Sequence, residues 1–136
     1  MKKNFTDSEI AILKSTLGSK LNVSINRAGN IKVINPNEPE NHSYWGSPAR
    51  GFWVLYHNNV GYLWRRHDGH GYCYPLNMRG RKNDLSCKPF VWTDDNGHTH
   101  KEYYRPYNIN KSYFNSVNEA LEYFVNYLKK HRNINL

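Results

Sequence analysis

The chain has 136 residues, the length of one ordinary domain, and 38% of them are hydrophobic. A domain of this size can bury most of its apolar surface without disulfides or metals, so we expect residues 1–136 to form a single domain. No stretch approaches the roughly 20 apolar residues of a membrane-spanning helix, which argues against a membrane protein. Nineteen lysines and arginines against eleven acidic residues give a net charge of +8, and a positive field of this kind attracts polyanions.

The N-terminal segment predicts a short helix. Thr6-Asp-Ser-Glu9 has the spacing of a capping box, in which each side chain bonds to the other residue's backbone N–H. Ile10, Leu13 and Leu17 then share one helical face, and Gly18 favours a stop. Acidic residues interrupt any apolar run here, so the segment does not read as a signal peptide, and we expect a cytoplasmic protein.

A β-hairpin is predicted next. Leu21, Val23 and Ile25 alternate with polar residues before a turn at 27–30, and Ile31 begins a second alternating run. Residues 35–50 follow with three prolines and no period, which predicts a long irregular loop.

Three adjacent antiparallel strands are predicted at 51–57, 60–67 and 71–76, because good turn residues separate them. Alternation sorts the side chains onto two faces and leaves open which face is the core. In the first strand Phe52, Val54 and Tyr56 share one face, and Trp53, Leu55 and His57 share the other. In the second strand Tyr62, Trp64 and Arg66 lie opposite Leu63, Arg65 and His67.

The C-terminal third predicts a basic loop at 78–88, one more hairpin at 89–107, and a last helix. That helix opens with a second capping-box pattern, Ser116-Val-Asn-Glu119, and continues as an apolar stripe at helical spacing. The fold class expected is therefore α+β: an antiparallel sheet of about five to seven strands, with an N-terminal and a C-terminal helix packed against it.

The stretch RRHDGHGYCY, residues 65–74, raises the question of metal chemistry. His67, His70 and Cys73 could supply three zinc ligands, but zinc sites usually use two tight pairs, and the chain has no CxxC. A hairpin turn that contains histidine is the preferred interpretation, with Cys73 and Cys87 as reduced thiols. We therefore expect no cofactor, and zinc stays an alternative.

Catalysis is expected to be absent, although one enzymatic alternative stays open. A metal-dependent nuclease using His67 and His70 would need further ligands on a helix directly after the hairpin. The sequence places a basic loop and more strand there instead. No phosphate-cradling glycine loop precedes a helix either.

Binding is the function that composition favours. Guanidinium groups pair with phosphates, and aromatic rings stack on unpaired bases. We therefore expect a small basic protein that contacts nucleic acid or a nucleoprotein complex through an aromatic and arginine-rich sheet face. The candidate binding residues are Trp53, Trp64, Arg65, Arg66, Tyr72, Tyr74, Arg79, Arg81 and Lys82.

The rival hypothesis is a protein partner. A short chain without a catalytic motif is typical of phage or mobile-element accessory proteins, including inhibitors of host defence such as anti-CRISPR proteins. Such proteins work by covering a surface, and Tyr, Trp and Arg are enriched at binding hot spots. Tyr44, Trp45 and Arg50 in the long loop would serve this role.

Overall fold

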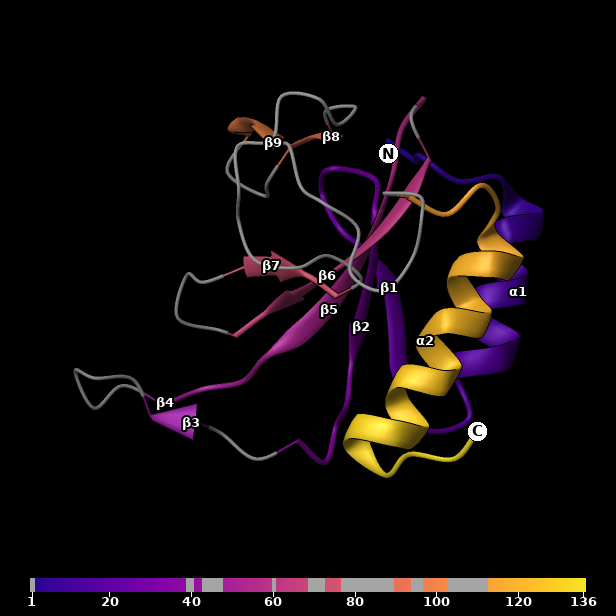
Figure 1. Ribbon diagram of the computed structural model, residues 1–136, viewed down its shortest axis with the longest axis vertical. Coiled ribbons are helices and arrows are strands. Elements are labelled where there is room, and N and C mark those ends of the chain that lie inside the picture. The colour runs from indigo at the N-terminus through magenta and orange to yellow at the C-terminus, as the bar shows by residue number, and fades with distance from the viewer. Residues whose placement is uncertain are drawn as a thin grey trace.

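The computed structural model describes residues 2–38, 41–42, 48–59, 61–68, 73–76, 90–93, 97–102 and 113–136. Its elements, in chain order, are α1 (Asp7–Leu17), β1 (Asn22–Ile25), β2 (Ile31–Ile34), β3 (Asn41–His42), β4 (Pro48–Ala49), β5 (Phe52–His57), β6 (Tyr62–His67), β7 (Cys73–Pro75), β8 (Phe90–Thr93), β9 (Thr99–Glu102) and α2 (Val117–Arg132). Figure 1 shows the two helices together on one side of the central sheet.

The α+β class and the antiparallel sheet are confirmed, but the expected sheet of about five to seven strands was too large. The sheet is built from β1, β2, β5 and β6, and β7 adds only three residues at its edge. The β8–β9 hairpin pairs with itself as a separate two-stranded ladder, as do β3 and β4. Alternation predicts strands, but it does not say which strands share one sheet.

Both helices begin where the capping patterns predict. Thr6 Oγ1 accepts from the Glu9 N–H at 3.1 Å, and the Glu9 carboxylate accepts from the Thr6 N–H at 2.8 Å. At α2, Ser116 Oγ accepts from the Glu119 N–H at 3.2 Å, while Glu119 reaches back to the N–H of Asn115. These bonds satisfy N–H groups that have no partner within the helix.

The first hairpin is confirmed, with β1 paired to β2 around the predicted turn. Gly29 has φ of +87° in this turn, a conformation that side chains with a Cβ rarely adopt. The N-terminal segment lies against the same turn, because the Asn4 N–H donates to the Gly29 carbonyl at 2.9 Å.

The core lies between the helices and one face of the sheet. Trp53 pairs across with Arg66, and Leu55 pairs with Trp64, which places these four side chains on one face. Trp53, Leu55 and Trp64 join Leu13 of α1 and others in one buried cluster with α2, whose Phe124 stacks on Trp64 with ring centroids 3.9 Å apart. The helix-facing side of the sheet is therefore the one that carries Trp53 and Trp64.

The opposite face of the sheet is also covered at its centre. Val54 is 1% exposed, Leu63 is 0% exposed and Arg65 is 1% exposed. The Asn58 amide Nδ2 donates to the Val91 carbonyl of β8 at 2.6 Å, so the β8–β9 hairpin is tied to the end of β5. The central strands thus contribute to two buried layers.

Only part of the predicted loop at 35–50 lies within the described residues. Residues 36–37 form a turn in which the Asn35 side chain accepts from the Asn37 N–H, and β3 pairs with β4. The predicted basic loop at 78–88 lies outside the described residues. Within the described ranges, no helix is long and apolar enough to cross a membrane.

Candidate functional site

Four of the nine candidate binding residues are buried. Trp53 and Trp64 are 0% exposed, Arg65 is 1% exposed and Arg66 is 4% exposed. Rings and guanidinium groups in these positions cannot stack on bases or pair with phosphates while the sheet keeps this packing. The backbone of Tyr74 pairs with Arg66 at the sheet edge. The remaining candidates, Tyr72, Arg79, Arg81 and Lys82, lie outside the described residues.

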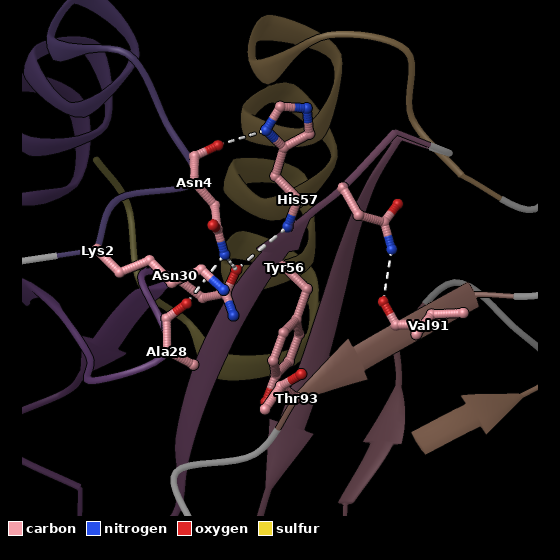
Figure 2. A pocket seen from close by; sticks show the side chains of 9 residues that line it. Lys2, Asn4, Ala28, Asn30, Tyr56, His57, Val91 and Thr93 are labelled. Atoms are coloured by element: carbon pink, nitrogen blue, oxygen red, sulfur yellow. Dashed lines mark hydrogen bonds between the residues drawn. The ribbon is translucent and has the colours of Figure 1, made fainter. Parts of the chain in front are cut away.

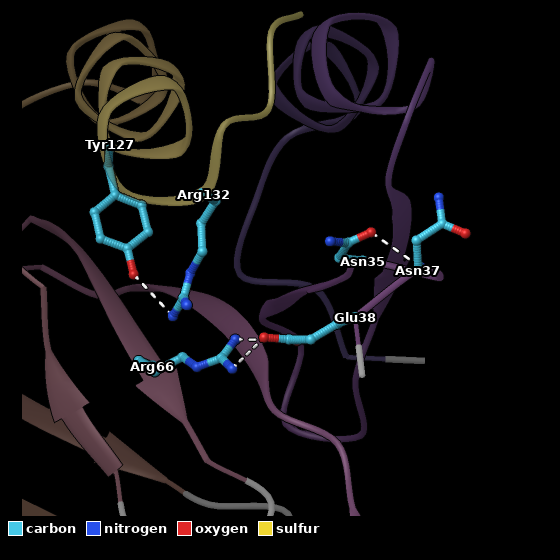
Figure 3. Close-up of polar contacts among 6 residues, drawn as sticks. All are labelled: Asn35, Asn37, Glu38, Arg66, Tyr127 and Arg132. Atoms are coloured by element: carbon cyan, nitrogen blue, oxygen red, sulfur yellow. Dashed lines mark hydrogen bonds and ion pairs between the residues drawn. The ribbon is translucent and has the colours of Figure 1, made fainter. Parts of the chain in front are cut away.

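Arg66 is buried beside its own counter-ion, Glu38 (Figure 3), and its own aromatic neighbour, Trp53. Its Nη2 lies 2.5 Å from Glu38 Oε1, and its Nη1 lies 3.4 Å from Glu38 Oε2. The guanidinium also lies over the Trp53 ring, 4.7 Å from the centroid. A Cβ at Gly51 would clash with Arg66 Nη2, so Gly51 leaves the space that the guanidinium fills. Arg66 therefore contacts the chain on both sides of the β3–β4 segment, at Glu38 before β3 and at Gly51 after β4.

The His67 ring packs against neighbouring side chains of the sheet. Its ring stacks on Phe52 with centroids 4.8 Å apart, and its Nε2 lies 3.0 Å from the Tyr56 hydroxyl. Burial, followed by the positive charges of Arg65 and Lys32, lowers the pKa of His67 to about 4. A histidine with this pKa is neutral at pH 7 and is a weak general base.

We predict that His67 makes the protein sensitive to mild acid. The pKa in the folded state, about 4, lies below the ordinary value of 6.5, so the unfolded state binds the proton first as pH falls. Stability is therefore full above about pH 6.5, declines as pH falls, and reaches its lowest level below the folded pKa. Urea unfolding at several pH values should show a decline for the wild type that is smaller for His67→Gln. Equal declines in both proteins would contradict this assignment.

In the part of the chain that the structure describes, no cluster of possible metal ligands supports the zinc or the nuclease alternative. No group of three His, Cys, Asp or Glu side chains gathers there. His70 and Cys87 lie outside the described residues, so the zinc alternative with His67, His70 and Cys73 stays an alternative that the structure does not test.

A polar cavity of about 210 Å³ lies at the end of β5, where four segments meet (Figure 2). The N-terminal segment, the β1–β2 turn, the end of β5 and β8 all contribute to its lining. The polar side chains among them are Lys2, Asn4, Asn30, Tyr56, Asn58 and Thr93. None of the lining side chains that the structure describes is acidic.

Asn30 organises this cavity. Its Oδ1 accepts from Asn4 Nδ2 at 3.0 Å and from the His57 N–H at 3.4 Å. Asn4 Nδ2 also donates to the Ala28 carbonyl at 3.1 Å. Asn30 is only 3% exposed, and its acceptor oxygen is fully engaged. The Asn30 Nδ2 group has no hydrogen-bond partner among the described residues, and it is not itself buried, because Trp53 Nε1 is the one buried side-chain donor without a partner in the described chain. An accessible donor therefore remains for the cavity.

The His57 side chain forms part of the cavity wall. Its Nδ1 lies 2.6 Å from the Asn4 carbonyl, so Nδ1 carries the proton and donates. The ring stacks on Tyr62, with centroids 4.0 Å apart, and the Tyr62 hydroxyl donates to the Glu9 carboxylate. Burial and this bond raise the pKa of Tyr62 to about 12, so its hydroxyl stays protonated. The contacts fix His57 and orient its backbone N–H toward Asn30.

Three exposed cations belong to the cavity lining or to positions next to it. Lys2, Arg27 and Lys101 are exposed. Lys2 lines the cavity, Arg27 belongs to the same turn as Ala28, and Lys101 is paired with Val91 of β8. Lys3 is also nearby in the chain, but its ammonium is paired with Asp7 at 3.4 Å. We call Lys2, Arg27 and Lys101 the basic rim.

Sequence reasoning missed this site. Lys2, Asn4 and Asn30 lie in segments that predict only a helix approach and a turn, and Asn30 is 26 residues from Asn4. The usable signal was the exposed charge of Lys2 and Arg27 beside a turn rich in asparagine and glycine. Comparison with protein-family models, curated proteins and solved structures finds no match to the chain.

Proposed function

We propose that the protein is a small, basic, non-catalytic binding protein that contacts nucleic acid, free or within a nucleoprotein complex. The observation that carries the proposal is the basic rim around a cavity that has no acidic lining residue in the described chain. Exposed lysines and arginines attract phosphates and position a polyanion without reading its sequence.

The contact surface proposed here differs from the sheet face expected from the sequence. The net charge of +8 supports binding to polyanions wherever the cations are accessible. Arg66 is neutralised by Glu38 inside the protein, whereas the three rim cations are exposed. The rim therefore has the charge that a phosphate backbone can reach.

The salt dependence of binding tests this proposal. We expect fluorescence anisotropy with labelled single-stranded and duplex DNA and RNA to show affinity that falls steeply with salt. The slope should be about 0.9 per phosphate contact for duplex DNA and about 0.7 for single strands. The triple variant Lys2→Gln, Arg27→Gln, Lys101→Gln should lose about two to three phosphate contacts. The slope of log K against log salt concentration should therefore become shallower by about 2.

A matched variant controls for total charge. Lys14, Lys129 and Lys130 are exposed on the two helices, away from the rim segments. Replacing all three with glutamine removes the same charge and should change the slope by less than half as much. Equal flattening by the two triple variants would show that binding depends on net charge and not on the rim.

A second candidate is inhibition of a host defence complex by protein–protein contact, as in anti-CRISPR proteins. It is supported by the way Arg66 secures Glu38 and Gly51, the two ends of the segment that contains β3 and β4. In Figure 1 these two strands lie apart from the central sheet. Tyr44 and Trp45, proposed for this role from the sequence, lie outside the described residues. Negligible nucleic-acid binding at low salt would favour this candidate.

A further inference from the structure

We propose that the cavity at the end of β5 is a binding site for a phosphate group. The proposal deepens the proposed function and rests on it, because a nucleic-acid strand on the basic rim would present a phosphate to the cavity. The same chemistry would also accept the phosphate of a free nucleotide or inorganic phosphate. The site consists of the Asn30 amide, the Lys2 ammonium and the Thr93 hydroxyl, which all line one cavity.

The first step is the unpaired donor of Asn30 in the cavity wall. Asn30 is 3% exposed, and both of its oxygen's hydrogen bonds come from inside the protein. The Nδ2 group itself is accessible, because Trp53 Nε1 is the one buried side-chain donor without a partner in the described chain. Among the described residues none accepts from Asn30 Nδ2. A group that accepts hydrogen bonds is therefore the complementary occupant.

The second step is charge. Lys2 is exposed and lines the cavity, and Figure 2 shows its side chain reaching toward Asn30. The described lining contains a cation and no carboxylate, so the local field favours an anion. The contrast is Arg66, whose charge is cancelled by a carboxylate 2.5 Å away. Hydrogen bonds from charged donors to phosphate are stronger than neutral ones.

The third step is size. The cavity measures about 210 Å³, the share of liquid volume that about seven water molecules occupy. A phosphate group is a compact tetrahedron of five atoms, and it fits this space together with ordered water. Thr93 of β8 also lines the cavity, and its Oγ1 lies 3.3 Å from Thr99 Oγ1. Because either hydroxyl can be the donor in this pair, the Thr93 hydroxyl can donate to an anion while it accepts from Thr99.

The test uses inorganic phosphate and a nucleoside 5′-monophosphate as probes, at constant ionic strength, on the full chain labelled with ¹⁵N. We expect the side-chain NH₂ signals of Asn30 to shift in a saturable way with both probes. Lys2→Gln should weaken binding about tenfold or more, because a charge-assisted bond is lost. The control Lys14→Gln removes an exposed charge on α1, away from the cavity, and should leave phosphate binding unchanged.

A sharper variant is Asn30→Asp, which keeps an acceptor oxygen for Asn4 and His57 and replaces the free donor with a charged acceptor. Phosphate binding should be lost in this variant, while thermal unfolding reports whether it folds. Lys2→Gln keeps the test valid if Asn30→Asp is unstable, because the Lys2 side chain is exposed.

The outcomes separate this inference from the proposed function. Shifts at Asn30 that Lys2→Gln weakens support the phosphate site. No shift at millimolar phosphate, or equal weakening by Lys2→Gln and Lys14→Gln, overturns the site, and salt-dependent binding of DNA or RNA would still support the proposed function. Phosphate binding at Asn30 without any binding of DNA or RNA would support the site and overturn the proposed function.

Discussion

Replacing Glu38 with alanine is expected to lower the free energy of unfolding by about 3–5 kcal/mol, because the change leaves a buried guanidinium without its counter-ion. Arg66 is 4% exposed, and Glu38 supplies both of its ionic contacts in the described chain. When one partner of a buried ion pair is removed, the other charge stays buried without compensation. Its desolvation penalty then lowers the free energy of unfolding. Urea unfolding of the wild type and Glu38→Ala measures this difference directly.

The double variant Glu38→Leu, Arg66→Met gives the control for this prediction. Because it removes both charges and keeps comparable apolar volume, it should recover most of the stability lost in Glu38→Ala. The surface pair Lys3–Asp7 gives the contrast, since its two side chains are 46% and 91% exposed. Asp7→Ala should change the free energy of unfolding by only about 1 kcal/mol or less. A comparably small effect of Glu38→Ala would show that water solvates the Arg66 guanidinium.

The same ion pair shows why the sequence could not place the candidate binding residues correctly. Arg65 and Arg66 follow Trp64 in a strand, and exposed arginine beside aromatic residues is the usual expectation for such a pattern. Arg66 is buried only because Glu38, 28 residues earlier, reaches it, and because Gly51 leaves room for it. Neither contact leaves a periodic signal in the sequence.

Local signals, by contrast, predicted the elements well. The two capping patterns mark the starts of α1 and α2, the alternation at 52–57 and 62–67 predicts the two faces within each of β5 and β6, and the turn residues between them predict their pairing. These features depend on residues within a few positions of one another. Which face becomes the core depends on where the helices pack, and the central strands carry apolar side chains on both faces, so alternation alone could not decide it.

The cavity was out of reach for the same reason. Its lining joins the N-terminal segment to a turn 26 residues later and to β8, which is tied to the end of β5 by the Asn58–Val91 bond. A sequence shows that asparagines are frequent in turns, but it does not show which amide keeps an unused donor. The sequence shows that Lys2, Arg27 and Lys101 are charged, but only the fold shows that they are exposed and lie in segments that meet at one cavity.

Replacing Trp64 with alanine is expected to destabilise the protein by about 3–5 kcal/mol, because it empties the centre of the contact between α2 and the sheet. The indole is 0% exposed and stacks on Phe124 with ring centroids 3.9 Å apart. Its Nε1 donates to the Ala120 carbonyl of α2 at 2.8 Å. Thermal and urea unfolding measure the loss, and an effect below about 1 kcal/mol would contradict this packing.

Phenylalanine variants of the two tryptophans separate packing from hydrogen bonding and also test the function. Trp53 is equally buried, but its Nε1 has no hydrogen-bond partner among the described residues. Trp64→Phe should therefore cost about 1 kcal/mol more than Trp53→Phe, the net value of one hydrogen bond. Under conditions where both variants are folded, their affinity for nucleic acid should match the wild type within about twofold, because neither ring faces the basic rim. A large loss of affinity in a folded Trp53→Phe or Trp64→Phe variant would return the contact surface to the central sheet and count against the rim.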